Sequence, residues 1–369
     1  MEKNFLTSSL YGELTKVVQA RFDAASKLNK ELFDKTIYKS YLTWDTPSIG
    51  LNFEEIIGKY NLTVAASTIG ERSKEPIIGA QGLETMKERV LNHAITLPMD
   101  IATYRKILAL LDSKSISDQA KKQQLIDTMW GGVTTVVNGV ETKLDIMFLQ
   151  ALSNKGIFEF NEENNPEGGV RGTIDYGQPA ENIATAKTAW TEANLSTVDC
   201  FEDIQAMLES AQDKTVLSKI LCAPALISYM CRSAKMKQLI HGTDKSSRIV
   251  QLRDINDYME SNGLPTFEKI QRQCRIQNGN TLTPYNPWNA KNMVFIPEGK
   301  IGVVKNAYSD NELKPEKDVV YSNYGRIRVS QWYVGETKGA NHGEFTKAES
   351  LSLPVITEMQ NIYTLQTQE

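Results

Sequence analysis

The chain has 369 residues, 41% of them hydrophobic, so it can bury a sizeable core in one large domain or two medium-sized domains. Its 41 Lys and Arg and 45 Asp and Glu give a net charge of −4 and form no long blocks, which excludes a general nucleic-acid or anionic-membrane surface. No apolar run of 18 residues occurs, and the amino terminus lacks a signal-peptide pattern. We therefore expect a folded, soluble protein made in a cytoplasm.

In chain order, the first predicted element is an amphipathic helix from Ser8 to Phe33. Short apolar patches separated by glycines then predict an extended, two-stranded excursion with a polar tip between Asn52 and Leu97. A short helix through Thr85–His93 is the competing interpretation. Beyond Pro98, the spacing of the apolar residues predicts a short helix that ends near Leu111.

The strongest pattern runs from Ser117 to Leu152, where apolar residues recur every three or four positions and predict one long helix, the spine helix. Ser115 is the expected start signal, and Gly156 is the expected stop. Each glycine destabilises a helix by about 1 kcal/mol relative to alanine. Gly131, Gly132 and Gly139 therefore predict a bend in the helix. Two separate helices divided at the glycine pair are the alternative.

Beyond this helix, the pattern predicts a hairpin and then a lobe in which strands and helices alternate. The hairpin pairs Ile157–Phe160 with Gly172–Tyr176 around an acidic loop. The predicted lobe elements are a helix over Phe201–Ala211, a strand over Thr215–Cys222, a second helix to Ile240, a strand over Thr266–Ile276 and two strands within Met293–Val304. The tail predicts a bend at Pro354 and a last strand, Asn361–Gln366, returning near the spine helix.

Signatures of catalysis and ligand binding are absent from the sequence: it has no Walker loop, no G-x-G-x-x-G after a strand and no G-x-S-x-G elbow. The three histidines, His93, His241 and His342, lack metal-ligand spacing and are expected to be surface or hydrogen-bonded residues. The carboxylate pairs Glu54-Glu55 and Glu162-Glu163 are expected in solvated loops. We predict no catalytic, cofactor-binding or metal-binding residue.

Cysteines and aromatic residues can serve disulfide, metal or nucleic-acid binding in other proteins, but neither type is expected to do so here. The cysteines form no C-x-x-C pair and are expected to be reduced thiols; they are Cys200, Cys222, Cys231 and Cys274. Aromatic residues gather in the last third of the chain without basic neighbours, which favours packing or a subunit contact over base stacking. These are Tyr285, Trp288, Tyr321, Tyr324, Trp332 and Tyr333.

The ordered set of elements and several short stretches resemble the lambda-like major capsid protein E family of tailed phages. The stretches are Ser218–Pro224 running into a helix with Arg232–Lys237, then Asn292–Pro297, and the closing segment from Leu353-Pro354 to Leu365. The resemblance implies an α+β protein with the Hong Kong 97 type fold. It implies a non-enzymatic shell protein whose pentamers and hexamers enclose double-stranded DNA in a virion.

The resemblance also implies a division of the chain into named parts. These are an N-terminal arm (1–45), an extended E-loop (46–98), the spine helix with the peripheral domain (99–195), an axial domain (196–339) and a return to the peripheral domain (340–369). The implied partners are copies of the chain itself, a separate scaffolding protein, a portal and a decoration protein, with no membrane. Assembly is implied in the host bacterial cytoplasm.

The residues themselves also favour assembly. An arm, a loop and a spine helix of this length cannot all bury their apolar faces within one subunit, so neighbouring subunits must cover them. Two other functions stay open on the sequence: an encapsulin-like compartment shell, and a soluble α/β enzyme with an unrecognised site between Ser196 and Gly339. We also expect Gly131-Gly132 to act as a hinge when a rounded precursor shell becomes the mature one.

Overall fold

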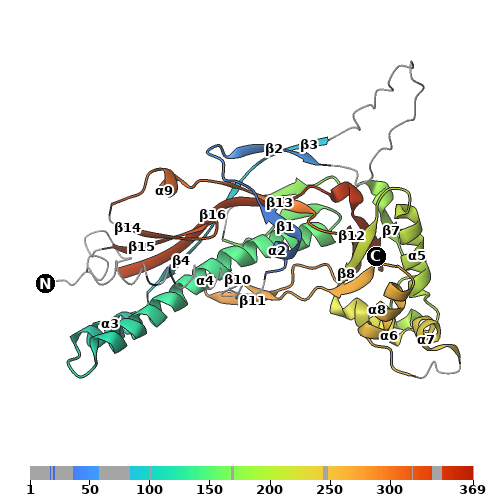
Figure 1. The fold of residues 1–369 in the computed structure, drawn as a ribbon, viewed down its shortest axis with the longest axis horizontal. Coiled ribbons are helices and arrows are strands. Elements are labelled where there is room, and N and C mark those ends of the chain that lie inside the picture. Colours follow the sequence, from blue (N-terminus) through green and yellow to red (C-terminus); the bar gives the residue numbers. More distant parts are fainter. Residues whose placement is uncertain are drawn as a thin grey trace, which may run out of the picture.

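The computed structural model describes residues 17, 20, 36–57, 84–99, 101–167, 170–243, 248–317, 319–334 and 343–368, and all structural statements refer to these. The predicted helix Ser8–Phe33 lies outside them apart from Val17 and Ala20, as do the tip of the extended excursion and His342. The described part combines a long body, built on one helix and one sheet, with an α/β lobe at one end (Figure 1).

The long helix is confirmed as α4, which runs over Asp118–Ser153 for 36 residues. Its N-cap is Ser117, whose side chain accepts a hydrogen bond from the backbone N–H of Ala120, and not the predicted Ser115. Gly156 has a φ of +78°, and its N–H bonds to a carbonyl of the last turn, so it ends the helix as predicted. The preceding helix, α3, spans Ile101–Asp112 and is also confirmed.

The α4 helix continues through Gly131 and Gly132, so the alternative of two separate helices is wrong. A Cβ added at Gly131 would meet no described atom within 4 Å, and one at Gly132 would meet only Leu97 Cδ2, at 4.0 Å. At Gly139 it would lie 3.1 Å from Cδ1 and Cγ2 of Ile95. Among these three glycines, close packing therefore requires only Gly139.

Replacing Gly131 with alanine is expected to stabilise the unassembled subunit by about 1 kcal/mol, because alanine is the better helix former and its methyl group meets open space. In the matched variant Gly139→Ala, displacement of Ile95 is expected to cancel this gain. Denaturant unfolding of both variants measures the difference. Equal stabilities would contradict the close approach of Ile95 to α4.

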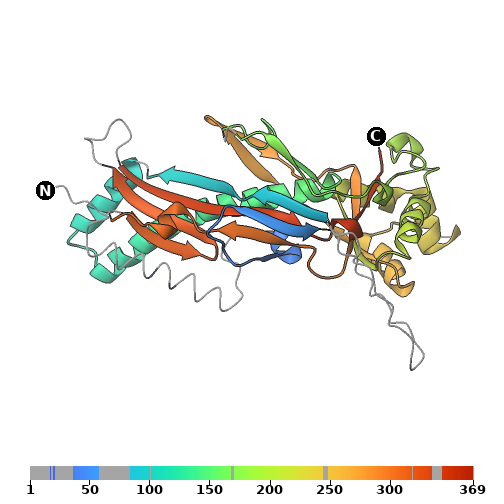
Figure 2. The ribbon, with the colours of Figure 1, turned by 90° about the horizontal axis from the view of Figure 1, so that it is seen from above.

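A six-stranded sheet covers α4 along most of its length (Figure 2). Its central strand, β16, spans Gly343–Ile356 and runs through Pro354, so the bend predicted there is wrong. Ser352 pairs with both Asn306 and Leu91, and Ala348 pairs with both Val329 and Ile95. One edge of β16 therefore carries β13 and β15 end to end, and β4 lies along the other edge. The further strands of this sheet are β1 (Leu42–Trp44), β4 (Leu91–Pro98), β13 (Gly302–Ala307), β14 (Val319–Tyr324) and β15 (Ile327–Val334).

Three separate hairpins leave the body. The first pairs β2 (Asn52–Ile57) with β3 (Glu84–Arg89), so the two-stranded excursion is confirmed and the competing helix is wrong. The second pairs β5 (Ile157–Phe160) with β6 (Gly172–Asp175), as predicted. The third, β10 (Cys274–Asn278) with β11 (Thr281–Tyr285), splits the predicted strand Thr266–Ile276, because the chain leaves the lobe after Ile270.

The lobe is built on a five-stranded sheet in the order β7-β17-β12-β8-β9. Its strands are β7 (Ile183–Thr185), β8 (Leu217–Cys222), β9 (Thr266–Lys269), β12 (Asn292–Pro297) and β17 (Tyr363–Gln366). Its helices are α5 (Cys200–Ala211), α6 (Pro224–Arg232), α7 (Ala234–His241) and α8 (Leu252–Ser261). The helix predicted to reach Ile240 is broken at the buried Ser233. The last strand exists as predicted, but it pairs with β12 and β7 of the lobe.

The short helices connect these parts. They are α2 (Tyr38–Tyr41), α9 (Asp310–Leu313) and the 3-10 turns Ala180–Asn182, Glu192–Asn194 and Met359–Asn361. The buried apolar side chains form three clusters: one fills the lobe, and the other two lie along α4 beneath the long sheet. Strands β13, β14 and β15 belong to the long sheet, although the expected axial range 196–339 includes them.

Candidate functional site

The residues that the sequence singled out as possible ligands do not converge. His93 lies on β4 and His241 at the end of α7, while Glu162 and Glu163 are exposed between β5 and β6. The cysteines are free thiols, and burial raises the pKa of Cys200 and of Cys222 to about 12. In the described ranges, no three His, Cys, Asp or Glu side chains are grouped so that they could hold a metal ion. Nor does any helix there have the length and apolar character needed to cross a membrane.

His93 is a hydrogen-bonded histidine, as predicted, but it is buried. Its Nε2 lies 3.0 Å from the carbonyl oxygen of Ser352 on β16 and donates to it, since a carbonyl only accepts. Burial, and secondarily the charge of Lys143, lowers the pKa of His93 from 6.5 to about 4. The imidazole is therefore neutral in the folded subunit at neutral pH.

Between pH 6.5 and 4, the unfolded chain protonates this histidine and the folded chain does not, so stability falls as the pH falls through this window. A shift of this size corresponds to about 3 kcal/mol. We expect the free energy of unfolding of the wild type to decrease by about that amount, relative to His93→Gln, on going from pH 7 to pH 4. Urea unfolding of both proteins across the range measures it.

Two carboxyl groups oppose this trend, because burial raises the pKa of Asp145 to about 6 and that of Glu344 to about 7. The contribution of each carboxyl group to the free energy of unfolding is lost as the pH rises through its pKa. This loss is the same in the wild type and in His93→Gln. The difference between the two proteins therefore isolates His93. The neighbouring variant Asn92→Gln, at an exposed and non-titrating position, should follow the wild type. Parallel pH profiles for the wild type and His93→Gln would contradict a buried neutral histidine.

A buried polar network joins three distant segments at the middle of the body. Asp145 of α4 is fully buried, and its Oδ1 accepts hydrogen bonds from the backbone N–H groups of Ile37 and Tyr38 at 2.9 and 2.8 Å. The Tyr38 hydroxyl donates to Glu141, one turn earlier on α4, at 2.5 Å. The guanidinium of Arg272 lies 3.0 Å from Asp145 Oδ2.

The electrostatics of this network fix the position of each segment. Burial raises the pKa of Asp145, whereas the two N–H donors and Arg272 lower it. Tyr38 stays neutral, because burial and the adjacent Glu141 raise its pKa well above 10. The network thus attaches residues 37–38 and the segment that follows β9 to the spine helix α4.

A groove of about 890 Å³ lies between β4, α4 and the hairpins β5–β6 and β10–β11. Its wall includes Lys143, whose ammonium donates to the carbonyl oxygen of Asn164 at 2.8 Å; burial lowers the pKa of this lysine to about 8. Three of the exposed large apolar side chains also line it: Ile95, Val170 and Leu282. The groove is thus a surface with both apolar and cationic character.

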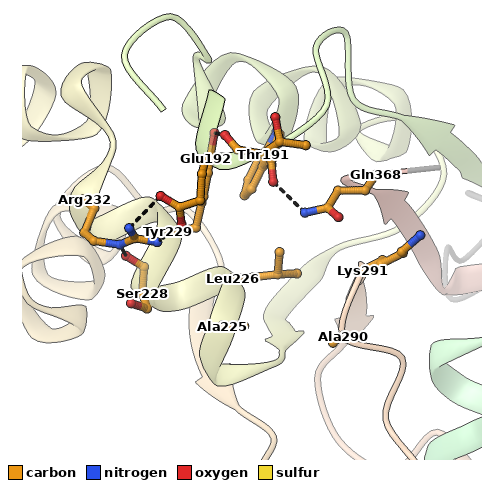
Figure 3. A pocket seen from close by; sticks show the side chains of 11 residues that line it. Thr191, Glu192, Ala225, Leu226, Ser228, Tyr229, Arg232, Ala290, Lys291 and Gln368 are labelled. Atoms are coloured by element: carbon orange, nitrogen blue, oxygen red, sulfur yellow. Dashed lines mark hydrogen bonds and ion pairs between the residues drawn. The ribbon is translucent and has the colours of Figure 1, made fainter. Parts of the chain in front are cut away.

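A second pocket, of about 540 Å³, lies in the lobe and is called the lobe pocket below. Figure 3 shows Leu226 and Ala225 of α6 facing Ala290 and Lys291 across it. Trp190 and Tyr229 stack beside it, with ring centroids 5.8 Å apart. At the rim, Arg232 donates to both carboxylate oxygens of Glu192, at 2.9 and 2.5 Å. The pocket therefore has an apolar floor and a charged rim, and it contains no histidine or cysteine.

Several of the carboxy-terminal aromatic residues serve packing, as predicted. Trp288 and Tyr324 are buried in the two clusters along α4. Trp332 stacks on Phe345, with centroids 5.6 Å apart, and Arg328 lies over the ring of Tyr321. The network and the two cavities were not predicted, because each is assembled from segments that are far apart in the sequence. The local signal was that Glu141 and Asp145 each directly follow a residue of the apolar stripe of α4, Val140 and Leu144.

Two solved structures share the fold of this chain. A crystal structure described as that of a prophage capsid protein from E. coli CFT073 has a TM-score of 0.56 and 12% identity, covering 94% of this chain and 98% of that one. A phage-related protein from Bordetella bronchiseptica RB50 has a TM-score of 0.50 and 8% identity, covering 95% and 96%. No curated protein sequence matches the chain. The fold is therefore the Hong Kong 97 type fold of phage capsid proteins.

The sequence family agrees with the fold. The family model of phage major capsid protein E matches residues 91–367, which is most of the chain. The chain belongs to this family. It is a structural protein of a tailed-phage or prophage capsid, not an enzyme; it associates with copies of itself into shells, and its place is the virion capsid.

Proposed function

We propose that this chain forms the pentamers and hexamers of a closed icosahedral shell that encloses double-stranded DNA without reading its sequence. The observation that carries the proposal is the β2–β3 hairpin. Its strands pair only with each other among the described strands, and it projects from the long body, with Phe53 at its base packed against the body's core (Figure 1). A protruding two-stranded ribbon is marginally stable by itself in water, so neighbouring subunits are needed to cover it.

The proposed parts of the subunit have the expected residue ranges, apart from the axial domain. We assign 1–45 to the arm, 46–98 to the E-loop, 99–195 to the spine helix and peripheral domain, and 340–369 to the returning segment. For the axial domain, strand pairing favours a range shorter than 196–339. It supports an end before β13, because β13, β14 and β15 pair in the long sheet.

A separate scaffolding protein, a portal and a decoration protein complete the proposal, with assembly in the host bacterial cytoplasm. The chain's mild negative charge supports an inner surface that holds DNA weakly, since tight phosphate contacts would hinder its packing and release.

Electron microscopy of the purified protein, alone and co-expressed with its neighbouring genes, tests the proposal. Closed shells or rings of five and six subunits are expected. A discrete small oligomer under both conditions would overturn it. Shells that form only with a co-expressed partner would support the separate scaffolding protein, and efficient assembly of shells of correct size from this chain alone would contradict it.

A further inference from the structure

The two hairpins that border the groove, β5–β6 and β10–β11, touch at their ends. The β10–β11 hairpin turns through Gly279 and Asn280, and Gly279 has a φ of +57°, which suits the first position of a tight two-residue turn. The backbone N–H of Gly279 donates a hydrogen bond to Oε1 of Glu167, in the loop between β5 and β6, at 2.7 Å. A carboxylate of one hairpin therefore lies directly on a backbone amide of the other.

The residue before this amide is an asparagine, Asn278. In an Asn-Gly pair, the backbone nitrogen of the glycine can attack the side-chain amide carbon of the asparagine and close a five-membered ring. Glycine has no Cβ to hinder this approach, and the two reacting groups belong to neighbouring residues. Asn278 and Gly279 are both exposed, so water can reach the product.

Ring closure requires that the proton of the glycine N–H be removed. A general base must lie within about 2.6 to 3.2 Å of the atom that carries the proton, and Glu167 Oε1 meets this condition at 2.7 Å. The side chain of Gln277 also donates to the carbonyl oxygen of Gly279 at 2.9 Å. The turn therefore holds the attacking nitrogen between two fixed contacts, one of which is a base.

The sequence contains two other Asn-Gly pairs, both within the described ranges, and in each a backbone carbonyl accepts the glycine N–H. Gly139 lies inside α4, where the carbonyls of the preceding turn accept the N–H groups. In the turn after α8, the N–H of Gly263 donates to the carbonyl oxygen of Glu260 at 3.0 Å. A carbonyl oxygen accepts a hydrogen bond without taking up the proton, whereas a carboxylate can take it up. Asn278-Gly279 is therefore the pair with a base in place.

We infer that the chain modifies itself at Asn278, with Glu167 as the general base. The nitrogen of Gly279 forms a bond to Cγ of Asn278 while its proton passes to Glu167. The Cγ–Nδ2 bond then breaks, and Nδ2 takes the proton from Glu167 and leaves as ammonia. A cyclic succinimide remains. One water molecule opens the succinimide at either carbonyl and gives aspartate or isoaspartate at position 278.

Either product weakens the contact between the two hairpins. Both products place a second negative charge close to Glu167, and like charges repel. Isoaspartate also lengthens the backbone at Asn278, which is the last paired position of β10, opposite Thr281. Since ammonia is lost, the change is not reversed and accumulates with the age of the subunit. This self-modification is an activity beyond the shell function and does not require assembly.

Mass spectrometry of the unassembled subunit, incubated at mildly alkaline pH, measures the reaction at each Asn-Gly pair. We expect aspartate and isoaspartate to accumulate at position 278. Glu167→Gln keeps a hydrogen-bond acceptor for Gly279 but cannot take up its proton. This variant should slow the reaction at Asn278 by about tenfold or more and leave the rate at Asn262, the internal reference, unchanged.

Glu163→Gln is the matched control, since it removes an exposed carboxylate from the same loop. The rate at Asn278 in this variant should equal the wild-type rate. The inference would be overturned by an absence of product at 278 in the wild type. It would also be overturned if Glu167→Gln left the rate at Asn278 unchanged or raised it, or slowed Asn262 equally. Because the subunits are unassembled, none of these outcomes depends on whether shells form.

Discussion

A subunit that lacks Ile69–Gly82 is expected to fold normally and to form no closed shell. The deleted segment lies outside the described residues, between two strands that pair over six positions. Those pairs remain after deletion, and β4 keeps its ladder with β16, so the long sheet does not depend on the segment. Thermal melting and circular dichroism of the unassembled variant measure folding, and electron microscopy measures assembly.

A matched variant distinguishes the effect of the length of the loop from the effect of its side chains. Replacing the same residues by a Gly-Ser segment of equal length keeps the span of the loop and removes its side chains. Failure of both variants to assemble, with normal melting, would mean that the side chains make the inter-subunit contact. Loss of soluble, folded protein in either variant would show that the segment belongs to the subunit's own core and would refute our domain division.

Asp145→Ala is expected to destabilise the unassembled subunit by about 3 to 5 kcal/mol, because it leaves the largely buried Arg272 without its carboxylate. The backbone N–H groups of Ile37 and Tyr38 also lose their acceptor. Asp145→Asn keeps one acceptor oxygen and should therefore lose less free energy of unfolding than Asp145→Ala. Denaturant unfolding gives the loss of free energy, and hydrogen exchange at Ile37 and Tyr38 should rise in the alanine variant before global unfolding.

The control for this prediction is Glu202→Gln, which removes an exposed carboxylate that pairs with Lys187 at 2.5 Å. We expect no measurable change in the free energy of unfolding of Glu202→Gln, since solvent already stabilises both charges. If Asp145→Ala were as stable as this control, the network would not hold residues 37–38 on α4.

Local patterns predicted the elements of this fold well. In α4, the residues of the predicted apolar stripe are buried at every position whose side chain is described: Leu125, Val133, Val136, Val140, Leu144, Met147 and Ala151. The β5–β6 hairpin and the two-stranded excursion followed from alternation and turn residues. Periodicity, however, is a property of neighbouring residues, so it could not give the strand pairing. The pattern did not show that β13 joins β16 while β12, a few residues earlier, joins β8.

The candidate surfaces were hidden for the same reason. The Asp145 network depends on residues 37–38, α4 and Arg272, which only the fold brings together. The lobe pocket likewise combines four separate segments. Pro354 misled the sequence interpretation, because a residue without an N–H is expected to interrupt a strand. In the structure it lies opposite Val304 within a continuous ladder.

The position of β17 in the lobe has a consequence for the timing of biosynthesis. Among the described strands, β7 pairs only with β17, and β12 depends on β17 for one of its two edges. Tyr363 and Leu365 of this strand also fill the lobe core. Since the ribosome makes β17 after every other described element, a nascent chain cannot complete its lobe while those residues are still in the exit tunnel. We expect translation intermediates and truncated products that lack β17 to be excluded from particles.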